Sequence, residues 1–229
     1  MGRIMVIGGT KGGTGKSTIT RNLAVFAAME PIDLCMVDAD PQHTVTNWVS
    51  RRSERKPQIF TVELTSPKLP NGLPDPRGIA PRLLSLADRH ELVLVDCGGR
   101  DSAELRSALL VADVLITPFF PSLDDVETLG ALMLLVQEIE LHRGRSLPTL
   151  AITSRAHPNK NTKSTRIAHE TLADYKEYMT VANTVVCQRD AHQKLAAEGM
   201  AVGDNPSLDA NAYTEMKRAY DEIFGGIYG

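Results

Sequence analysis

The chain has 229 residues, of which 42% are hydrophobic and 23% are charged, and its formal net charge is −3. This length and composition predict a single α/β domain, residues 1–229, with a substantial buried core. The small negative charge gives no overall basic field for nucleic acid, and no apolar run reaches the roughly 18 residues of a membrane span. The N-terminus does not look like a signal peptide, because its apolar run leads straight into a glycine-rich loop.

The cysteines and histidines give no sign of a metal centre. Cys35, Cys97 and Cys187 are isolated, with no CxxC pair, and two of them sit inside apolar strands. This pattern predicts buried, reduced thiols. The six histidines are scattered without zinc-ligand spacing. Any catalytic metal is therefore expected to be Mg²⁺, held by oxygen ligands and phosphates.

Short apolar runs and longer helical patterns alternate along the chain. The expected strands cover residues 4–7, 33–37, 59–62, 92–96, 114–117, 147–153 and 184–186. The expected helices cover residues 19–27, a stretch around Trp48, 81–87, 102–111, 124–142, 164–178, 190–198 and 210–224. Residues 65–81 are rich in proline and glycine and are expected to form a loop. This alternation predicts a doubly wound, mostly parallel sheet with helices on both faces.

A glycine-rich segment lies between the first expected strand and the first expected helix. Residues 10–18 read Thr-Lys-Gly-Gly-Thr-Gly-Lys-Ser-Thr. A strand, a glycine turn and a helix start in this order form a phosphate cradle, because successive N–H groups point inward at a helix N-terminus. The cradle residues are Gly12, Gly13, Thr14, Gly15, Lys16, Ser17 and Thr18.

Within this cradle, Lys16 would reach the β- and γ-phosphates, and the Ser17 hydroxyl would ligate Mg²⁺. The segment departs from the common P-loop spacing, because Thr10 stands where a glycine is expected and Lys11 is an additional lysine at the loop entrance. The alternative interpretation is a glycine-rich turn with two solvated lysines.

Three aspartates follow buried strands. Asp96 ends an apolar strand, where a carboxylate is costly unless solvated or paired, and it would hold Mg²⁺ through a coordinated water. Asp38 and Asp40 lie two residues apart, so in extended backbone they share a face and could both look toward the metal and the attacking water. The alternative for these two is a helix N-cap or a solvated strand end.

Three motifs together resemble a known family, the ParA/MinD deviant Walker A P-loop ATPases. They are the Lys-Gly-Gly-x-Gly-Lys-Ser loop that begins at Lys11, the Asp-x-Asp-Pro-Gln segment that begins at Asp38, and a Walker B strand at 92–99. They occur in the family's order and at similar spacing, and the resemblance covers nearly the whole chain. It looks most similar to the small plasmid-partition (ParF-like) members, because the first expected strand begins within the first few residues of the chain.

The resemblance implies a weak, Mg²⁺-dependent ATPase with ATP and ADP as its nucleotides. Lys11, Lys16 and Asp40 would be the catalytic residues, with Asp40 orienting water and Asp38 supporting it near the metal. Ser17, Asp40 and Asp96 would hold Mg²⁺, the acids through water. Lys11 would cross a two-fold axis and act in trans on the partner's nucleotide, so that ATP controls formation of a homodimer.

Two further segments end strands on the expected ligand-binding edge. Residues 118–125 resemble the family's Pro-Ser-x-x-Asp segment and are either a nucleotide-sensing loop or a helix start capped by Ser122 or Asp124. Arg155 ends another strand and would border the adenine. The asparagine that the family often offers for base recognition is missing from this strand end.

A basic segment at residues 141–169 suggests that nonspecific double-stranded DNA is a partner. Residues 141–169 contain no acid. The bases in this segment are Arg143, Arg145, Arg155, Lys160, Lys163 and Arg166. They could contact phosphates without reading bases, and a dimer would strengthen this binding. The alternative is an ordinary solvated loop.

The leading hypothesis is a cytoplasmic, nucleoid-associated partition ATPase that moves a plasmid, chromosome or other cargo. It implies a ParB-like or centromere-binding partner that stimulates hydrolysis. The alternative is a membrane-cycling positioner like MinD, but residues 216–224 mix both charge signs and suit a docked helix, so no stable membrane association is expected. A metabolic or metal-delivery ATPase is a third class, and the nitrogenase-reductase option within it lacks its cysteine pair.

Overall fold

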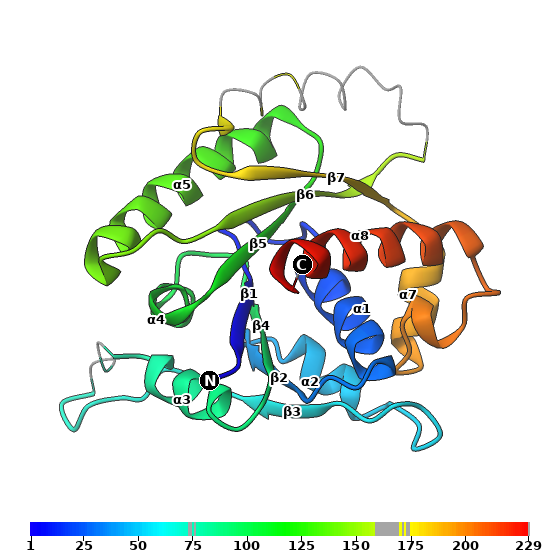
Figure 1. Cartoon of the computed structure of the whole chain (residues 1–229), viewed down its shortest axis with the longest axis horizontal. Helices are drawn as coiled ribbons and strands as arrows, with labels where there is room; N and C mark the ends of the chain where they lie inside the picture. Colours follow the sequence, from blue (N-terminus) through cyan, green and yellow to red (C-terminus); the bar gives the residue numbers. More distant parts are fainter. Residues whose placement is uncertain (73–74, 76, 159–169, 171, 173–174, 229) are drawn as a thin grey trace.

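The computed structural model describes residues 1–72, 75, 77–158, 170, 172 and 175–228. These residues form a seven-stranded sheet in the order β3-β2-β4-β1-β5-β6-β7 (Figure 1). Every pairing between neighbours is parallel, which confirms the predicted doubly wound sheet. The strands are β1 (Arg3–Ile7), β2 (Leu34–Ala39), β3 (Phe60–Glu63), β4 (Leu92–Cys97), β5 (Val114–Phe119), β6 (Thr149–Ala156) and β7 (Thr180–Cys187).

Helices cover both faces of the sheet (Figure 1). One face carries α3 (Ala80–Ala87), α4 (Ala103–Val111) and α5 (Leu123–Arg143). The other carries α1 (Lys16–Met29), α2 (Thr44–Val49), α7 (Asp190–Ala197) and α8 (Ala210–Tyr228), with a short 3-10 turn, η2 (Val202–Asp204). The central strands are buried on both faces and are therefore mostly apolar, and their side chains alternate between the two cores.

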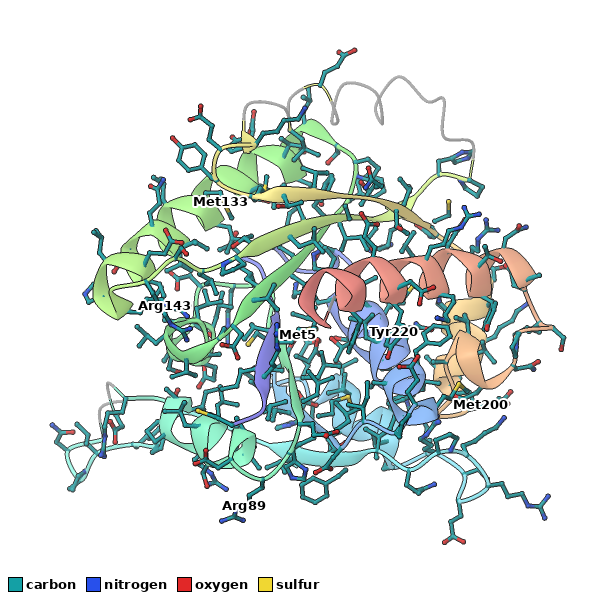
Figure 2. The ribbon with its side chains drawn as sticks, viewed as in Figure 1. Met5, Arg89, Met133, Arg143, Met200 and Tyr220 are labelled. Carbon is teal, nitrogen blue, oxygen red and sulfur yellow. The ribbon has the colours of Figure 1, made fainter. Side chains whose placement is uncertain are left out.

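The alternation can be followed in β1. Ile4 and Val6 belong to the core beneath α3, α4 and α5, whereas Met5 and Ile7 belong to the core beneath α1 and α8. Figure 2 shows Met5 in the interior beside the sheet and Tyr220 between α8 and α1. Both are almost completely buried. The same alternation in β2 and β4 turns Asp38 and Asp96 toward the α1 side.

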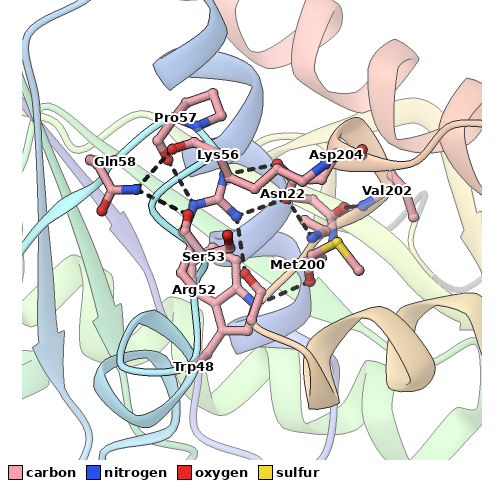
Figure 3. A network of polar contacts seen from close by, with 12 residues as sticks. Asn22, Trp48, Arg52, Ser53, Lys56, Pro57, Gln58, Met200, Val202 and Asp204 are labelled. Carbon is pink, nitrogen blue, oxygen red and sulfur yellow. Dashed lines mark hydrogen bonds and ion pairs between the residues drawn. The ribbon is translucent and has the colours of Figure 1, made fainter.

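A buried polar network fixes α2 to the segment before α8 (Figure 3). The Trp48 indole donates to the carbonyl of Met200 at 3.0 Å. Arg52 forms a bidentate pair with Asp204, with both N–O distances 2.8 Å. Asn22 of α1 accepts from the Val202 amide at 3.0 Å, so α1, α2 and η2 are held as one unit.

The expected elements agree with the structure except near the C-terminal third. β7 begins at Thr180, earlier than the expected 184–186, because it is an edge strand whose mixed polar and apolar residues give a weak pattern. The turn η2 was not expected. Most of the helix expected at 164–178 lies outside the described residues, and 176–178 form a turn. Across the described ranges, no helix combines the length and apolar character needed to cross a membrane.

Candidate nucleotide-binding site

The phosphate-loop segment lies at the carboxyl ends of the central strands. β1 pairs with β4 on one side and with β5 on the other, so the loop that follows Ile7 leaves the sheet where the strand order reverses. Open α/β sheets bind their ligands at this switch point. The ends of β2, β4 and β6 surround the same edge and supply the remaining side chains of the site.

The loop conformation depends on glycine at two positions. Gly13 and Gly15 have φ of 76° and 93°, a region that residues with a Cβ rarely adopt. A Cβ on Gly15 would also overlap the Ser154 hydroxyl of β6. A Cβ on Gly12 would meet nothing within 4 Å, which leaves open space above the loop for a ligand.

Lys16 is buried at the start of α1, with an exposed fraction of 6%. Its Nζ donates to the Lys11 carbonyl at 2.7 Å and lies 3.5 Å from the Thr14 hydroxyl, two neutral oxygens. Burial lowers its pKa, while Asp96 and Asp40 act in the opposite direction. An ammonium group held this way is a ready partner for phosphate oxygens.

Asp96 and Ser17 make the second half of the site. Asp96 is fully buried and accepts hydrogen bonds from Ser17 Oγ at 2.8 Å and from Thr20 Oγ1 at 2.7 Å. Burial raises the pKa of Asp96 to about 6, although both hydroxyl hydrogen bonds lower it. Thr20 is a residue that our sequence analysis missed. It lies one helical turn after Lys16 and Ser17, so its spacing was a usable signal.

Asp38 and Asp40 lie at the same strand end but face different surroundings. Asp38 is opposite Asp96 in the β2–β4 register, is 1% exposed, and accepts from the amides of Asp40 at 3.1 Å and Thr46 at 2.9 Å. One of its oxygens thus holds the turn that follows β2, and the other holds the first turn of α2, whose N-cap residue is His43. Asp40 lines the site cavity and accepts from the Gln42 amide at 2.9 Å.

Lys11 is engaged within its own chain. Its Nζ forms an ion pair with Asp125 in the first turn of α5. Asp125 is 3% exposed and also accepts from the Phe120 amide at 2.8 Å. Ser122 caps α5 by accepting from the Asp125 amide, in agreement with the capping alternative for this loop. Asp125 is the aspartate of the Pro-Ser-x-x-Asp segment noted in the sequence, but its pairing with Lys11 was not predicted.

A cavity of about 550 Å³ lies over the loop. Gly12, Gly13, Gly15, Lys16, Ser17 and Thr18 line it from the loop side. Asp40 and the segment Gly98–Arg100 line the side next to β2 and β4, and Arg155 and Gln193 close it from β6 and α7. Arg21, Arg100 and Gln193 were not expected from the sequence. Arg21 lies in α1 only three residues after Thr18, whereas the approach of Gln193 depends on how α7 packs.

The residues present fit a nucleoside triphosphate with Mg²⁺. The open space above Gly12, the buried ammonium of Lys16 and the loop amides suit phosphate. A hydroxyl and a carboxylate 2.8 Å apart, from Ser17 and Asp96, suit a hard cation that keeps water and phosphate ligands. The described residues hold no group of three or more His, Cys, Asp and Glu side chains able to form an all-protein metal site.

This fold and site define a P-loop nucleotide-binding protein. Residues 3–142, more than half of the chain, match the family model described as ATPase MipZ. The chain therefore belongs to the MipZ ATPase family, and its predicted resemblance to ParA/MinD ATPases is confirmed. No curated protein matches the chain.

Several solved structures share the fold along the whole chain. Apo McdA from Cyanothece is 15% identical with a TM-score of 0.77, covering 99% of this chain and 100% of that chain. A plasmid partition protein from Borrelia burgdorferi, described as putative and bound to AMPPNP, is 17% identical with a TM-score of 0.75 and the same coverage. MinD from Pyrococcus horikoshii, complexed with Mg-ADP, is 18% identical with a TM-score of 0.69, covering 100% and 99%. At these identities the likeness concerns the fold.

Proposed function

We propose that this chain is an ATP-dependent, dimerising ATPase that segregates or positions a cargo such as a plasmid, a chromosome or a protein assembly. The observation that carries the proposal is the buried Lys16 beside the Ser17–Asp96 pair, beneath a cavity of about 550 Å³. Three similar structures support adenine nucleotides with Mg²⁺ as the ligands, because they are described as bound to AMPPNP, ATP and Mg-ADP.

Each side chain has a distinct role in the proposed reaction. Lys16 and the loop amides bind the β- and γ-phosphates. Ser17 directly, and Asp96 and Asp40 through water, hold Mg²⁺, which supplies positive charge against the phosphate oxygens. Asp40 orients the attacking water. Asp38 positions Asp40 by accepting a hydrogen bond from the Asp40 amide at 3.1 Å.

Lys11 acts in trans in this proposal. Lys16 and the metal already neutralise the phosphates in cis, and Lys11 lies at the loop entrance with its side chain 38% exposed. On dimerisation Lys11 leaves Asp125 and reaches the nucleotide of a second copy, which makes the homodimer dependent on ATP.

Calorimetry and light scattering test these roles. Wild type is expected to bind ATP and ADP with Mg²⁺ and to dimerise with ATP. Lys11→Ala is expected to keep ATP binding and lose the ATP-dependent dimer. Asp40→Ala is expected to bind ATP and to hydrolyse it about 100-fold more slowly. This is the size of effect that follows when an enzyme loses a side chain that positions or deprotonates water. Absence of nucleotide binding in wild type would overturn the proposal.

The proposal includes nonspecific double-stranded DNA as a ligand of the ATP dimer. In the described part of the basic segment, Arg143 donates to the Leu109 and Ala112 carbonyls at 2.9 and 2.6 Å, and Arg145 pairs with Asp113 at 3.7 Å. Arg155 is exposed and lines the nucleotide cavity, and Lys160, Lys163 and Arg166 lie outside the described residues. A gel shift with random duplex, run with ADP, ATP and a slowly hydrolysed analogue, should show ATP-dependent, salt-sensitive binding.

A ParB-like partner and a cytoplasmic, nucleoid-associated location complete the proposal. Membrane cycling is the competing outcome. The apolar face of α8 is already packed in the core through residues including Ala219, Tyr220 and Ile223, which are at most 2% exposed. Sedimentation with liposomes and ATP is therefore expected to leave the protein in the supernatant, and ATP-dependent pelleting would favour the membrane alternative.

A further inference from the structure

β6 ends beside the phosphate loop with an unusual backbone conformation. Arg155 has a φ of 54°, in the left-handed region. For a long side chain this conformation is strained, because the Cβ crowds the backbone, and such strain persists mainly where the surroundings impose it. Because Arg155 lines the cavity, this strain points to a functional role for its side chain.

The Arg155 side chain lies along the phosphate loop. Its Nη1 donates to the Gly13 carbonyl. The same nitrogen is 3.6 Å from where a Cβ on Gly13 would lie, and its Cγ is 3.6 Å from the corresponding point on Gly15. Both glycines have positive φ, so the arginine packs against the two bends that shape the cradle.

The charge of Arg155 has no carboxylate partner among the described residues. Other arginines of the chain do have one. Arg52, Arg77, Arg106 and Arg189 each form an ion pair at 2.7–2.8 Å. Arg155 has instead a neutral carbonyl, is exposed, and lines the same cavity as Lys16 and Ser17. A guanidinium in this setting has donors left for an anion, and its planar geometry suits phosphate oxygens.

We propose that Arg155 is a polyphosphate-binding residue in cis, whose guanidinium exchanges the Gly13 carbonyl for oxygens of the bound nucleotide's phosphates. This rests on the proposed function and deepens it. Arg155 then contacts the phosphates of the nucleotide, whereas the sequence analysis expected it to border the adenine. Nucleotide binding in the single chain then draws on Arg155 as well as Lys16, without any contribution from a partner's Lys11.

The test compares ATP with inorganic tripolyphosphate, which has the phosphates and no base. Calorimetry is done in a Lys11→Ala background, so that no lysine acts in trans. Arg155→Gly is expected to weaken binding of both ligands about 10- to 100-fold, the range for losing a charge-assisted hydrogen bond. Arg155→Lys is expected to recover part of the affinity. Arg89→Ala is the control, because Arg89 is exposed at a remote surface (Figure 2).

Thermal melting separates this role from a structural one. Arg155→Gly relieves the backbone at a positive φ, so its melting temperature should equal or exceed that of the parent protein. Affinity that is unchanged for both ligands, or lost for ATP alone, overturns the phosphate assignment and leaves the proposed ATPase function intact. Failure of tripolyphosphate to compete with ATP in the parent also overturns it. A parent protein that binds no adenine nucleotide instead overturns the proposed function itself.

Discussion

Lys11 and Asp125 form an ion pair that joins the phosphate loop to the first turn of α5. The hydrogen bond to Asp125 raises the pKa of Lys11, so the lysine stays charged. Asp125 is itself fixed, because it is buried and holds the Phe120 amide. If Lys11 acts on a second copy's nucleotide, this pair has to break first. The Lys11–Asp125 pair in the single chain therefore opposes dimerisation, unless the contact of Lys11 with the partner's nucleotide is more favourable than the pair that it replaces.

Asp125→Asn tests this competition. Asparagine can still accept from the Phe120 amide, but it no longer pairs with the Lys11 charge. We expect the variant to dimerise with ATP at a lower protein concentration than wild type, measured by light scattering with a slowly hydrolysed analogue. Glu127→Gln, an exposed acid further along α5, is the control and should behave as wild type. Equal or weaker dimerisation of Asp125→Asn would contradict the competition.

The segment after β4 lies directly against the phosphate loop, and Gly99 makes that approach possible. A Cβ on Gly99 would lie 2.5 Å from the Gly12 Cα, a backbone clash that a rotamer change cannot relieve. Gly99→Ala is expected to push the two segments apart and to lower ATP hydrolysis about 100-fold, since small displacements of reacting groups have effects of this order.

Gly98→Ala is the matched control for this prediction. A Cβ on Gly98 would lie 3.5 Å from Asp40 Cγ, which is ordinary contact, so this neighbour should tolerate alanine. Hydrolysis rates of the two variants, measured at saturating ATP, decide the point. Similar rates for both would mean that the close approach to Gly12 does not matter for the reaction.

Much of the fold could be predicted because its signals are local. The apolar runs of β1, β2 and β4 and the loop from Lys11 to Thr18 each carry their information within a few residues. β7 was underestimated for a physical reason. It is an edge strand, and part of its backbone bonding goes to glutamates of α8, so it does not need a fully apolar sequence.

The site was predicted less completely, because several of its contacts join distant parts of the chain. Nothing near Lys11 indicates that Asp125 will hold it, and the position of Arg155 over Gly13 follows from a strained φ that the sequence does not reveal. The two aspartates of the Asp-x-Asp segment were expected to face the metal together. In the structure Asp38 holds backbone amides and Asp40 lines the cavity.

The Arg52–Asp204 pair gives a prediction about stability (Figure 3). Both side chains are at most 1% exposed, and Arg52 also donates to the carbonyls of Pro57 and Gly199. Asp204→Asn should lower the free energy of unfolding by about 3–5 kcal/mol, because it leaves a buried charge uncompensated. Urea unfolding measures this loss. Arg52→Met with Asp204→Leu should cost less than the sum of the two single changes, and strict additivity would contradict the pairing.

Glu215 of α8 gives a pH-dependent prediction. It accepts from Arg189 Nη2 at 2.7 Å and from the Cys187 amide of β7 at 3.0 Å. Burial raises the pKa of Glu215, but the hydrogen bonds from Arg189 and Cys187 outweigh it, so the folded-state pKa lies below the ordinary 4.5. A lowered pKa means that this stabilisation is present above pH 4.5 and is lost as the pH falls through the folded-state value.

Glu215→Gln should therefore lower the free energy of unfolding near neutral pH by about 1–3 kcal/mol, the range for a hydrogen bond to a charged group. The difference from wild type should shrink as the pH falls from 4.5 through the lower folded-state pKa, because the wild-type carboxylate becomes protonated over this range. Urea titrations across this range measure it, with Glu127→Gln, an exposed acid on α5, as the control. A difference that stays constant with pH would assign the loss to packing, since only the charged form of Glu215 anchors the edge strand β7 in this account.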